Sequence, residues 1–177
     1  MYEHSITLDR GQAYQITITQ PDKAPIIADA IKLPKFTPVD EKDHSIGYYA
    51  ICFSNFLYEN VNTPTTEKLQ LKLLNRTTNE YESVGQPVAF GQTTECSVHQ
   101  YPYNVYDGLR GSSGFIKVVI IGSDGNESEL TYRLDGEIQP SFTDRWTLML
   151  GLGHKWTITG VRDDNNIPLR TTQWLFK

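Results

Sequence analysis

One segment constrains the fold more than any other, FIKVVIIGSDGNESELTYRLDGEI, which spans residues 115–138. Its first part is an apolar run interrupted only by Lys117. A turn sequence, GSDGNES, follows, and Leu130, Tyr132 and Leu134 then recur at every second position. Because side chains alternate between the two faces of a strand, this period of two predicts a β-hairpin.

Segments with a similar pattern recur along the chain, separated by residues typical of turns. We expect a hairpin with one buried face at 4–21, another hairpin at 68–90, an apolar strand at 46–59, and strands within 145–152, 155–161 and 167–176. Tyr and Thr are frequent and favour strands. About nine to eleven short strands with little helix predict an all-β fold, a two-sheet antiparallel β-sandwich or jelly-roll-like arrangement, with a closed barrel as the alternative.

The segment 46–59, IGYYAICFSNFLYE, is the most apolar in the chain. One face of such a strand would carry Tyr48, Ala50, Cys52, Ser54 and Phe56, and the other Tyr49, Ile51, Phe53, Asn55 and Leu57. Since both faces are largely apolar, we expect a central strand that is covered on both sides.

We expect a single domain over residues 1–177, because no low-complexity linker or fixed repeat divides the chain. Residues 21–45 break the strand pattern. They contain four prolines and the charged run DEKDH, which predict an arm or long loop. Within this segment, APIIADAIKLP is expected to form a short strand or a helical turn.

The two cysteines, Cys52 and Cys96, leave two interpretations open. A disulfide between them would resemble the bridge of a sandwich core, but no tryptophan lies between them as an immunoglobulin core would require. We therefore favour two buried free thiols.

The charge pattern excludes several kinds of partner. The formal net charge is −5, and no Lys/Arg cluster is dense enough to neutralise a run of phosphates, so we expect neither nucleic acid nor an anionic membrane surface as a partner. No stretch approaches the roughly 18 consecutive apolar residues that cross a bilayer. The N-terminal residues do not resemble a signal peptide, so we expect synthesis in the cytoplasm.

No strong catalytic or metal-binding motif is present. The four histidines lie at no metal-ligand spacing from another His or Cys, and GSSG at 111–114 lacks the pattern of a nucleophile elbow. The segments GSDGNESE and RDDNN are rich in oxygen ligands, but Asp, Asn and Gly are also what tight turns require, and we interpret both as turns. We expect no metal, no cofactor and no enzymatic activity.

One stretch, SVHQYPYNVYDGLRGSSGF at 97–115, suggests a recognition surface. Tyrosine rings provide large contact areas for sugars and for protein partners. The candidate partner-binding residues are Tyr101, Tyr103, Tyr106, Asp107 and Arg110. The competing interpretation is that Tyr101 and Tyr106 fold back over the end of the sheets.

Together these patterns favour a non-enzymatic structural or assembly protein. We expect a virion component, of a phage, such as a capsid, decoration, spike or tail protein, that contacts copies of itself or other structural subunits. The proline-punctuated segment 21–45 and the tyrosines would form the contacts. The alternative is a carbohydrate- or ligand-binding β-sandwich module that uses the Tyr-rich loop 99–110, with a glycan as its partner.

Overall fold

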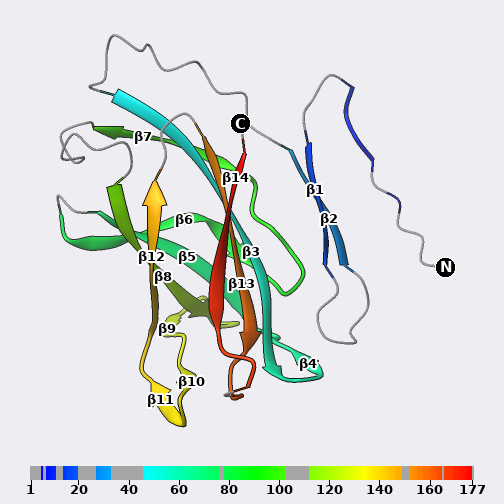
Figure 1. Cartoon of the computed structure of the whole chain (residues 1–177), viewed down its shortest axis with the longest axis vertical. Helices are drawn as coiled ribbons and strands as arrows, with labels where there is room; N and C mark the ends of the chain where they lie inside the picture. The colour runs from blue at the N-terminus through cyan, green and yellow to red at the C-terminus, as the bar shows by residue number, and fades with distance from the viewer. Residues whose placement is uncertain are drawn as a thin grey trace.

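The computed structural model describes residues 5, 7–10, 14–19, 27–32, 46–75, 78–102, 112–148, 152–164 and 166–176. These residues form fourteen strands and no helix (Figure 1). The strands are β1 (Tyr14–Thr19), β2 (Ile27–Lys32), β3 (Ile46–Asn60), β4 (Thr63–Pro64), β5 (Lys68–Asn75), β6 (Glu80–Val88), β7 (Ser97–Pro102), β8 (Ser112–Ile121), β9 (Glu127–Glu129), β10 (Tyr132–Leu134), β11 (Glu137–Gln139), β12 (Phe142–Leu148), β13 (Gly153–Val161) and β14 (Arg170–Phe176).

Two five-stranded sheets make up most of the described chain. The β8 sheet has the order β12-β8-β5-β6, with β9 also paired to β8, and the β3 sheet has the order β14-β13-β3-β4, with β7 also paired to β3. The pairs β1-β2 and β10-β11 form two further small sheets. The prediction of an all-β chain with antiparallel sheets is therefore confirmed. The number of strands exceeds the expected range because four of them have only two or three residues.

One pairing departs from the expected antiparallel arrangement, because β3 and β13 run parallel. Their register extends from Ala50 opposite Gly153 to Tyr58 opposite Val161. The strand before β13 in the chain, β12, belongs to the other five-stranded sheet. The chain therefore crosses from one sheet to the other before it forms β13. A hairpin turn between β3 and β13 would have made this pair antiparallel.

Strand β3 is paired along both of its edges. One edge meets β13, and the other meets β7 at its start and β4 at its end. Residues 91–94 pair with β3 between β7 and β4, where the Asn55 amide donates to the Gln92 carbonyl (3.1 Å) and the Thr94 amide donates to the Phe53 carbonyl (2.8 Å). All residues from Ala50 to Tyr58 are buried, which confirms a central strand covered on both faces.

The core draws side chains from both five-stranded sheets. Its members are Ile51, Phe53 and Leu57 of β3, Leu69, Leu71 and Leu73 of β5, Ile116, Val118 and Ile120 of β8, Val84 and Val88 of β6, Trp156 and Ile158 of β13, and Leu130, Phe142 and Leu169. Burying a side chain of this kind contributes about 1.5–3 kcal/mol, so this shared cluster is the main source of stability.

Two expected hairpins pair differently in the structure. Strand β1 pairs with β2, from Tyr14 opposite Lys32 to Thr19 opposite Ile27, and not with the residues before it. The expected hairpin at 4–21 is therefore wrong, and Ile16 is 53% exposed where a buried face was expected. Of the two alternatives for residues 24–34, a short strand or a helical turn, the structure has the strand, β2. Turn-forming residues lie on both sides of β1 in the sequence. The sequence therefore does not show which neighbouring segment pairs with β1.

Residues 115–138 form one tight turn but not one long hairpin. Strand β8 returns through the predicted turn, where the Gly122 amide donates to the Asn126 carbonyl (2.9 Å), to the short strand β9. The chain then leaves the β8 sheet, so β10 pairs with β11 around the Asp135–Gly136 turn and not with β8. Leu130 is still fully buried in the core, as its alternation suggested.

The cysteines form a disulfide, and the expectation of free thiols is wrong. Cys52 lies in β3 and is bonded to Cys96, which directly precedes β7. Since Ile51 faces Ser97 in the β3–β7 register, the cysteines occupy the next directly opposed position. Their Cα atoms are 4.4 Å apart, the close spacing of a directly opposed, non-hydrogen-bonded antiparallel pair. Sequence spacing alone did not reveal this register.

We expect the disulfide to stabilise the fold measurably. The bridge closes a loop of sequence separation 44, and loops of this size contribute about 2–4 kcal/mol by restricting the unfolded chain. The variant C52A/C96A should lose this amount in urea unfolding. Adding a reductant should destabilise the native chain and leave the double variant unchanged. An identical response of both proteins to the reductant would contradict the expectation.

Arg162, directly after β13, connects several segments at one end of the sheets. Its Nε donates to the Thr131 carbonyl (2.8 Å) and its Nη1 to the carboxylate of Glu67 (3.1 Å), with Glu59 at 3.5 Å. Its own amide donates to the Tyr58 carbonyl at the end of β3 (2.8 Å). The planar guanidinium thus holds two carboxylates and a carbonyl from three parts of the chain.

Replacing this guanidinium should cost more than replacing an exposed arginine. We expect R162M to lower the free energy of unfolding by about 1–3 kcal/mol, because charge-assisted hydrogen bonds are lost and two carboxylates lose their counterion. The matched control is R133M, which removes an ion pair with Asp163 at 3.8 Å and an exposed hydrogen bond to the Gly136 carbonyl (3.0 Å), and should cost less than about 1 kcal/mol. Urea unfolding of both variants measures the difference, and equal losses would refute the assignment.

Candidate functional site

The predicted Tyr-rich site falls mostly outside the described residues. Tyr101 belongs to β7, where its backbone lies opposite Gly47 of β3. Tyr103, Tyr106, Asp107 and Arg110 lie outside the described residues. The attachment points are described, since β7 ends at Pro102 in the β3 sheet and β8 begins at Ser112 in the β8 sheet. The segment therefore connects the two large sheets, and its binding role stays a prediction.

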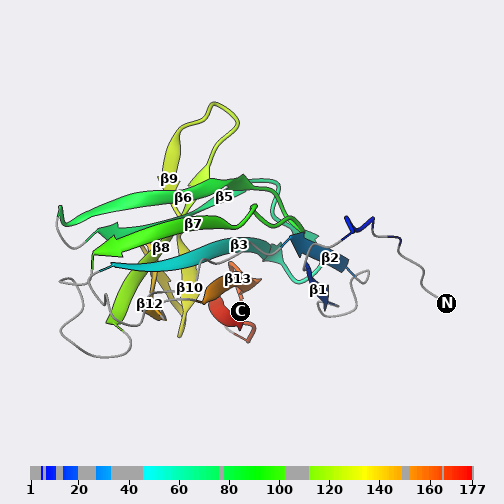
Figure 2. The ribbon, with the colours of Figure 1, turned by 90° about the horizontal axis from the view of Figure 1, so that it is seen from above.

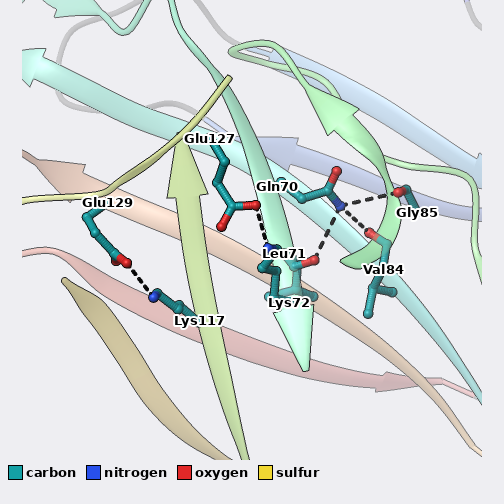
Figure 3. A network of polar contacts seen from close by, with 8 residues as sticks. All are labelled: Gln70, Leu71, Lys72, Val84, Gly85, Lys117, Glu127 and Glu129. Carbon is teal, nitrogen blue, oxygen red and sulfur yellow. Dashed lines mark hydrogen bonds and ion pairs between the residues drawn. The ribbon is translucent and has the colours of Figure 1, made fainter. Parts of the chain in front are cut away.

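The β8 sheet carries a row of charges that the sequence did not single out. Lys72 of β5 and Lys117 of β8 lie directly opposite each other, an unfavourable arrangement for like charges. Strand β9 provides the compensation, because Glu127 pairs with Lys72 and Glu129 with Lys117 (2.5 Å; Figure 3). The lysine side chains are only 14% and 20% exposed. The signal for this row in the sequence was a Lys at an outward position in each of two apolar strands.

Aromatic rings lie beside two cations of the β8 sheet, Lys117 and Arg145. The Lys117 ammonium is 5.7 Å from the centre of the Tyr81 ring, and the Arg145 guanidinium is 5.5 Å from that of Phe115. Both distances are in the range of cation–π attraction. Each of the two lysines thus has a carboxylate partner from β9, and Lys117 also has an aromatic neighbour.

The two oxygen-rich segments are held as turns. The Asp124 carboxylate accepts hydrogen bonds from the amide (3.0 Å) and the side chain (2.6 Å) of Asn126, and these bonds lower the pKa of Asp124. Asp164 accepts from the amide of Asn166 in the same way (2.7 Å). These are Asx-type turns, as expected for both segments. Within the described residues, no group of three or more His, Cys, Asp or Glu side chains is arranged to hold a metal ion.

His154 is a buried member of β13 and not part of a metal site in the described chain. Its Nδ1 lies 2.6 Å from the side-chain amide nitrogen of Gln173 in β14. An amide N–H is a donor, so this imidazole nitrogen accepts the hydrogen bond. The contact links neighbouring strands of the β3 sheet.

Gln70 fills an irregularity in the β8 sheet. The register between β5 and β6 shifts from Leu69 opposite Val88 to Leu71 opposite Val84, so three residues of β6 oppose Gln70 alone. Its side-chain amide, which is buried, contacts the carbonyls of Leu71 (3.2 Å), Val84 (2.8 Å) and Gly85 (3.2 Å; Figure 3). The side chain thus replaces backbone donors that a regular ladder would supply.

This arrangement predicts the effects of two substitutions at Gln70. We expect Q70L to lower stability by about 1–3 kcal/mol, because the carbonyls of Val84 and Gly85 lose a buried donor. Q70E should cost more, since its carboxylate would face the same carbonyl oxygens in a buried position. Urea unfolding at neutral pH measures both. If Q70E were as stable as the native chain, the donor role would be wrong.

The β1–β2 hairpin is one of the two small sheets of the described chain. It pairs with neither five-stranded sheet and lies to one side of both (Figures 1 and 2). Ile16 in β1 is 53% exposed. A two-stranded hairpin is marginally stable in water by itself. Its exposed apolar side chain, and outer edges that no other described strand pairs with, therefore suit contact with another surface.

Comparison of the chain with models of protein families, with curated proteins and with solved structures finds no match. Among the described residues, no helix is long and apolar enough to cross a membrane.

Proposed function

We propose that the chain is a non-enzymatic structural subunit that assembles through protein–protein contacts, and that it forms part of a virion as a capsid, decoration, spike or tail component. The observation that carries this proposal is the β1–β2 hairpin, which pairs with neither large sheet and exposes Ile16. A partner that covers the hairpin would supply the stability that two strands lack alone. Copies of this chain or other structural subunits are the partners.

The scaffold in this proposal is a β-sandwich in which the two five-stranded sheets face each other. Both sheets contribute to one core. The side chain of Asn55 in β3 donates to the Val88 carbonyl in β6 (3.2 Å), and the Thr171 hydroxyl in β14 donates to the Asp144 carboxylate in β12. Since β6 and β12 are the two outer strands of the β8 sheet, contacts at both of its sides support face-to-face packing.

The disulfide supports a location outside the reducing cytoplasm for the folded protein. Disulfides persist in oxidising surroundings, including virion surfaces, and are rare in cytosolic proteins. A chain made in a cytoplasm and then incorporated in a released particle would meet both conditions. The Cys52–Cys96 bridge would form, or persist, after release.

A glycan-binding module is the second candidate, because the Tyr-rich segment joins the two large sheets. Loops that extend from the end of a rigid scaffold are a common place for recognition. Binding to a glycan array that is lost in Y103A, with an unchanged unfolding curve, would favour this function over assembly.

Assembly should depend on the exposed isoleucine of the hairpin. We expect the native chain to form a discrete oligomer at increasing concentration, and I16D to associate at least about tenfold more weakly, since an apolar contact worth more than 1.4 kcal/mol would be lost. Light scattering behind a sizing column measures both. The matched control is L8D, which changes a similarly exposed apolar residue outside the hairpin and should assemble normally. A 20.1 kDa monomer at every concentration would contradict self-assembly.

A further inference from the structure

One row of residues crosses three neighbouring strands of the β3 sheet. Lys155 of β13 lies opposite Cys52 of β3, and Cys52 is bonded on its other side to Cys96, which directly precedes β7. The strands lie side by side in the order β13, β3, β7 (Figure 2). Because neighbouring strands are about 4.8 Å apart, the lysine and the disulfide occupy adjacent positions in the sheet.

Lys155 and Cys52 share the face of the β3 sheet that lies away from the common core. The core takes Ile51 from β3 and Trp156 from β13, and side chains alternate between the two faces of a strand. Lys155 and Cys52 are nevertheless only 1% and 0% exposed. The fold thus places a lysine in a covered layer beside the disulfide.

The other charged and titratable groups near this face are placed differently. Arg170 of β14 shares the face, but it is exposed and lies two strands away from the bridge. Glu95, next to the bridge, is exposed, and Tyr58 lies at the far end of β3. Of the Lys, Arg, Asp and Glu residues whose exposure the structure describes, Lys155 alone is buried.

The two ends of the bridge differ in their access to solvent. Cys52 is fully buried, whereas Cys96 is half-buried. A small thiol therefore reaches the bridge from the side of Cys96. In thiol–disulfide exchange, the displaced sulfur leaves more readily when its thiolate is stabilised, and a neighbouring lysine stabilises a thiolate.

We propose that the Cys52–Cys96 bridge is a redox switch, and that Lys155 keeps it responsive to small thiols and disulfides of the glutathione class. A small thiolate attacks the sulfur of Cys96, the S–S bond breaks, and Cys52 leaves as a thiolate that Lys155 stabilises. A second small thiolate then attacks the first and releases Cys96. The two small thiols are oxidised to their disulfide, and their two protons remain on the cysteines. Closure of the bridge is the reverse reaction.

Lys155 acts in this switch through its charge. It makes an interaction of its own in the structure and keeps it, because an ammonium stabilises a nearby anion through space. The switch controls how β7 is attached to β3, and β7 leads into the Tyr-rich segment. It does not involve the β1–β2 hairpin, so its failure and the failure of the proposed assembly are separate results.

Titration of the Cys52 thiol in the full chain tests the role of the charge. In C96A, ultraviolet absorbance of the thiolate against pH, with C52A/C96A as the baseline, should give a Cys52 pKa below the ordinary value of a thiol. The pKa should rise by at least about one pH unit in C96A/K155M and stay low in C96A/K155R. The matched control is C96A/K68M, which changes an exposed lysine of the other sheet and should match C96A.

The C96A variant decides the matter even where K155M does not fold, because it leaves Lys155 unchanged. A Cys52 pKa at or above the ordinary value of a thiol in C96A would overturn the proposal. An equal pKa in folded C96A and C96A/K155M would also overturn it.

The rate and direction of exchange provide the second test. At neutral pH, reduced glutathione should open the bridge of K155M at least about threefold more slowly than that of the native chain, since the leaving thiolate is less stabilised. K68M should react at the native rate. Mass spectrometry of samples quenched with acid should find the glutathione adduct on Cys96. Equal rates in native chain and K155M, or an adduct on Cys52, would refute the switch.

Discussion

The structure depends on the pairing of β3 along both of its edges. This strand carries the most apolar segment of the chain, and its residues from Ala50 to Tyr58 are buried on both faces. Its backbone groups need partners over the same length, because an unpaired buried amide or carbonyl costs as much as a lost hydrogen bond. Strands β13, β7 and β4 and residues 91–94 supply these partners. The positions of the remaining strands follow from how the chain connects these segments.

The features that could be predicted from the sequence are those that depend on neighbouring residues. The alternation in 46–59 predicted both faces of β3, because the period of two follows directly from strand geometry. The turn at GSDGNES was predicted because Asp124, Gly125 and Asn126 form it through contacts within a few residues. The pairing of strands was less predictable. Nothing in the residues around β1 states that β2 is its partner, or that β13 joins β3 in parallel.

The same limit applies to the cysteines and to the candidate sites. Whether Cys52 and Cys96 oppose each other depends on the β3–β7 register, which is a tertiary property. The charged row on the β8 sheet appears only when β5, β8 and β9 lie side by side, since its four residues come from three strands. Of the predicted Tyr-rich site, the backbone of Tyr101 is the part within the described residues. The separate pairing of β1 with β2 likewise became visible only in the structure.

The parallel pairing of β3 with β13 has a consequence for how the chain is made. Ala50 meets Gly153, so the two partners are 153 − 50 = 103 positions apart in the chain. A ribosome releases β3 long before β13 exists, and contacts of such large separation form slowly. Residues up to Pro102 emerge earlier, so β7 and residues 91–94 can pair with one edge of β3 first. The other edge of β3 then stays unpaired until β13 has been synthesised.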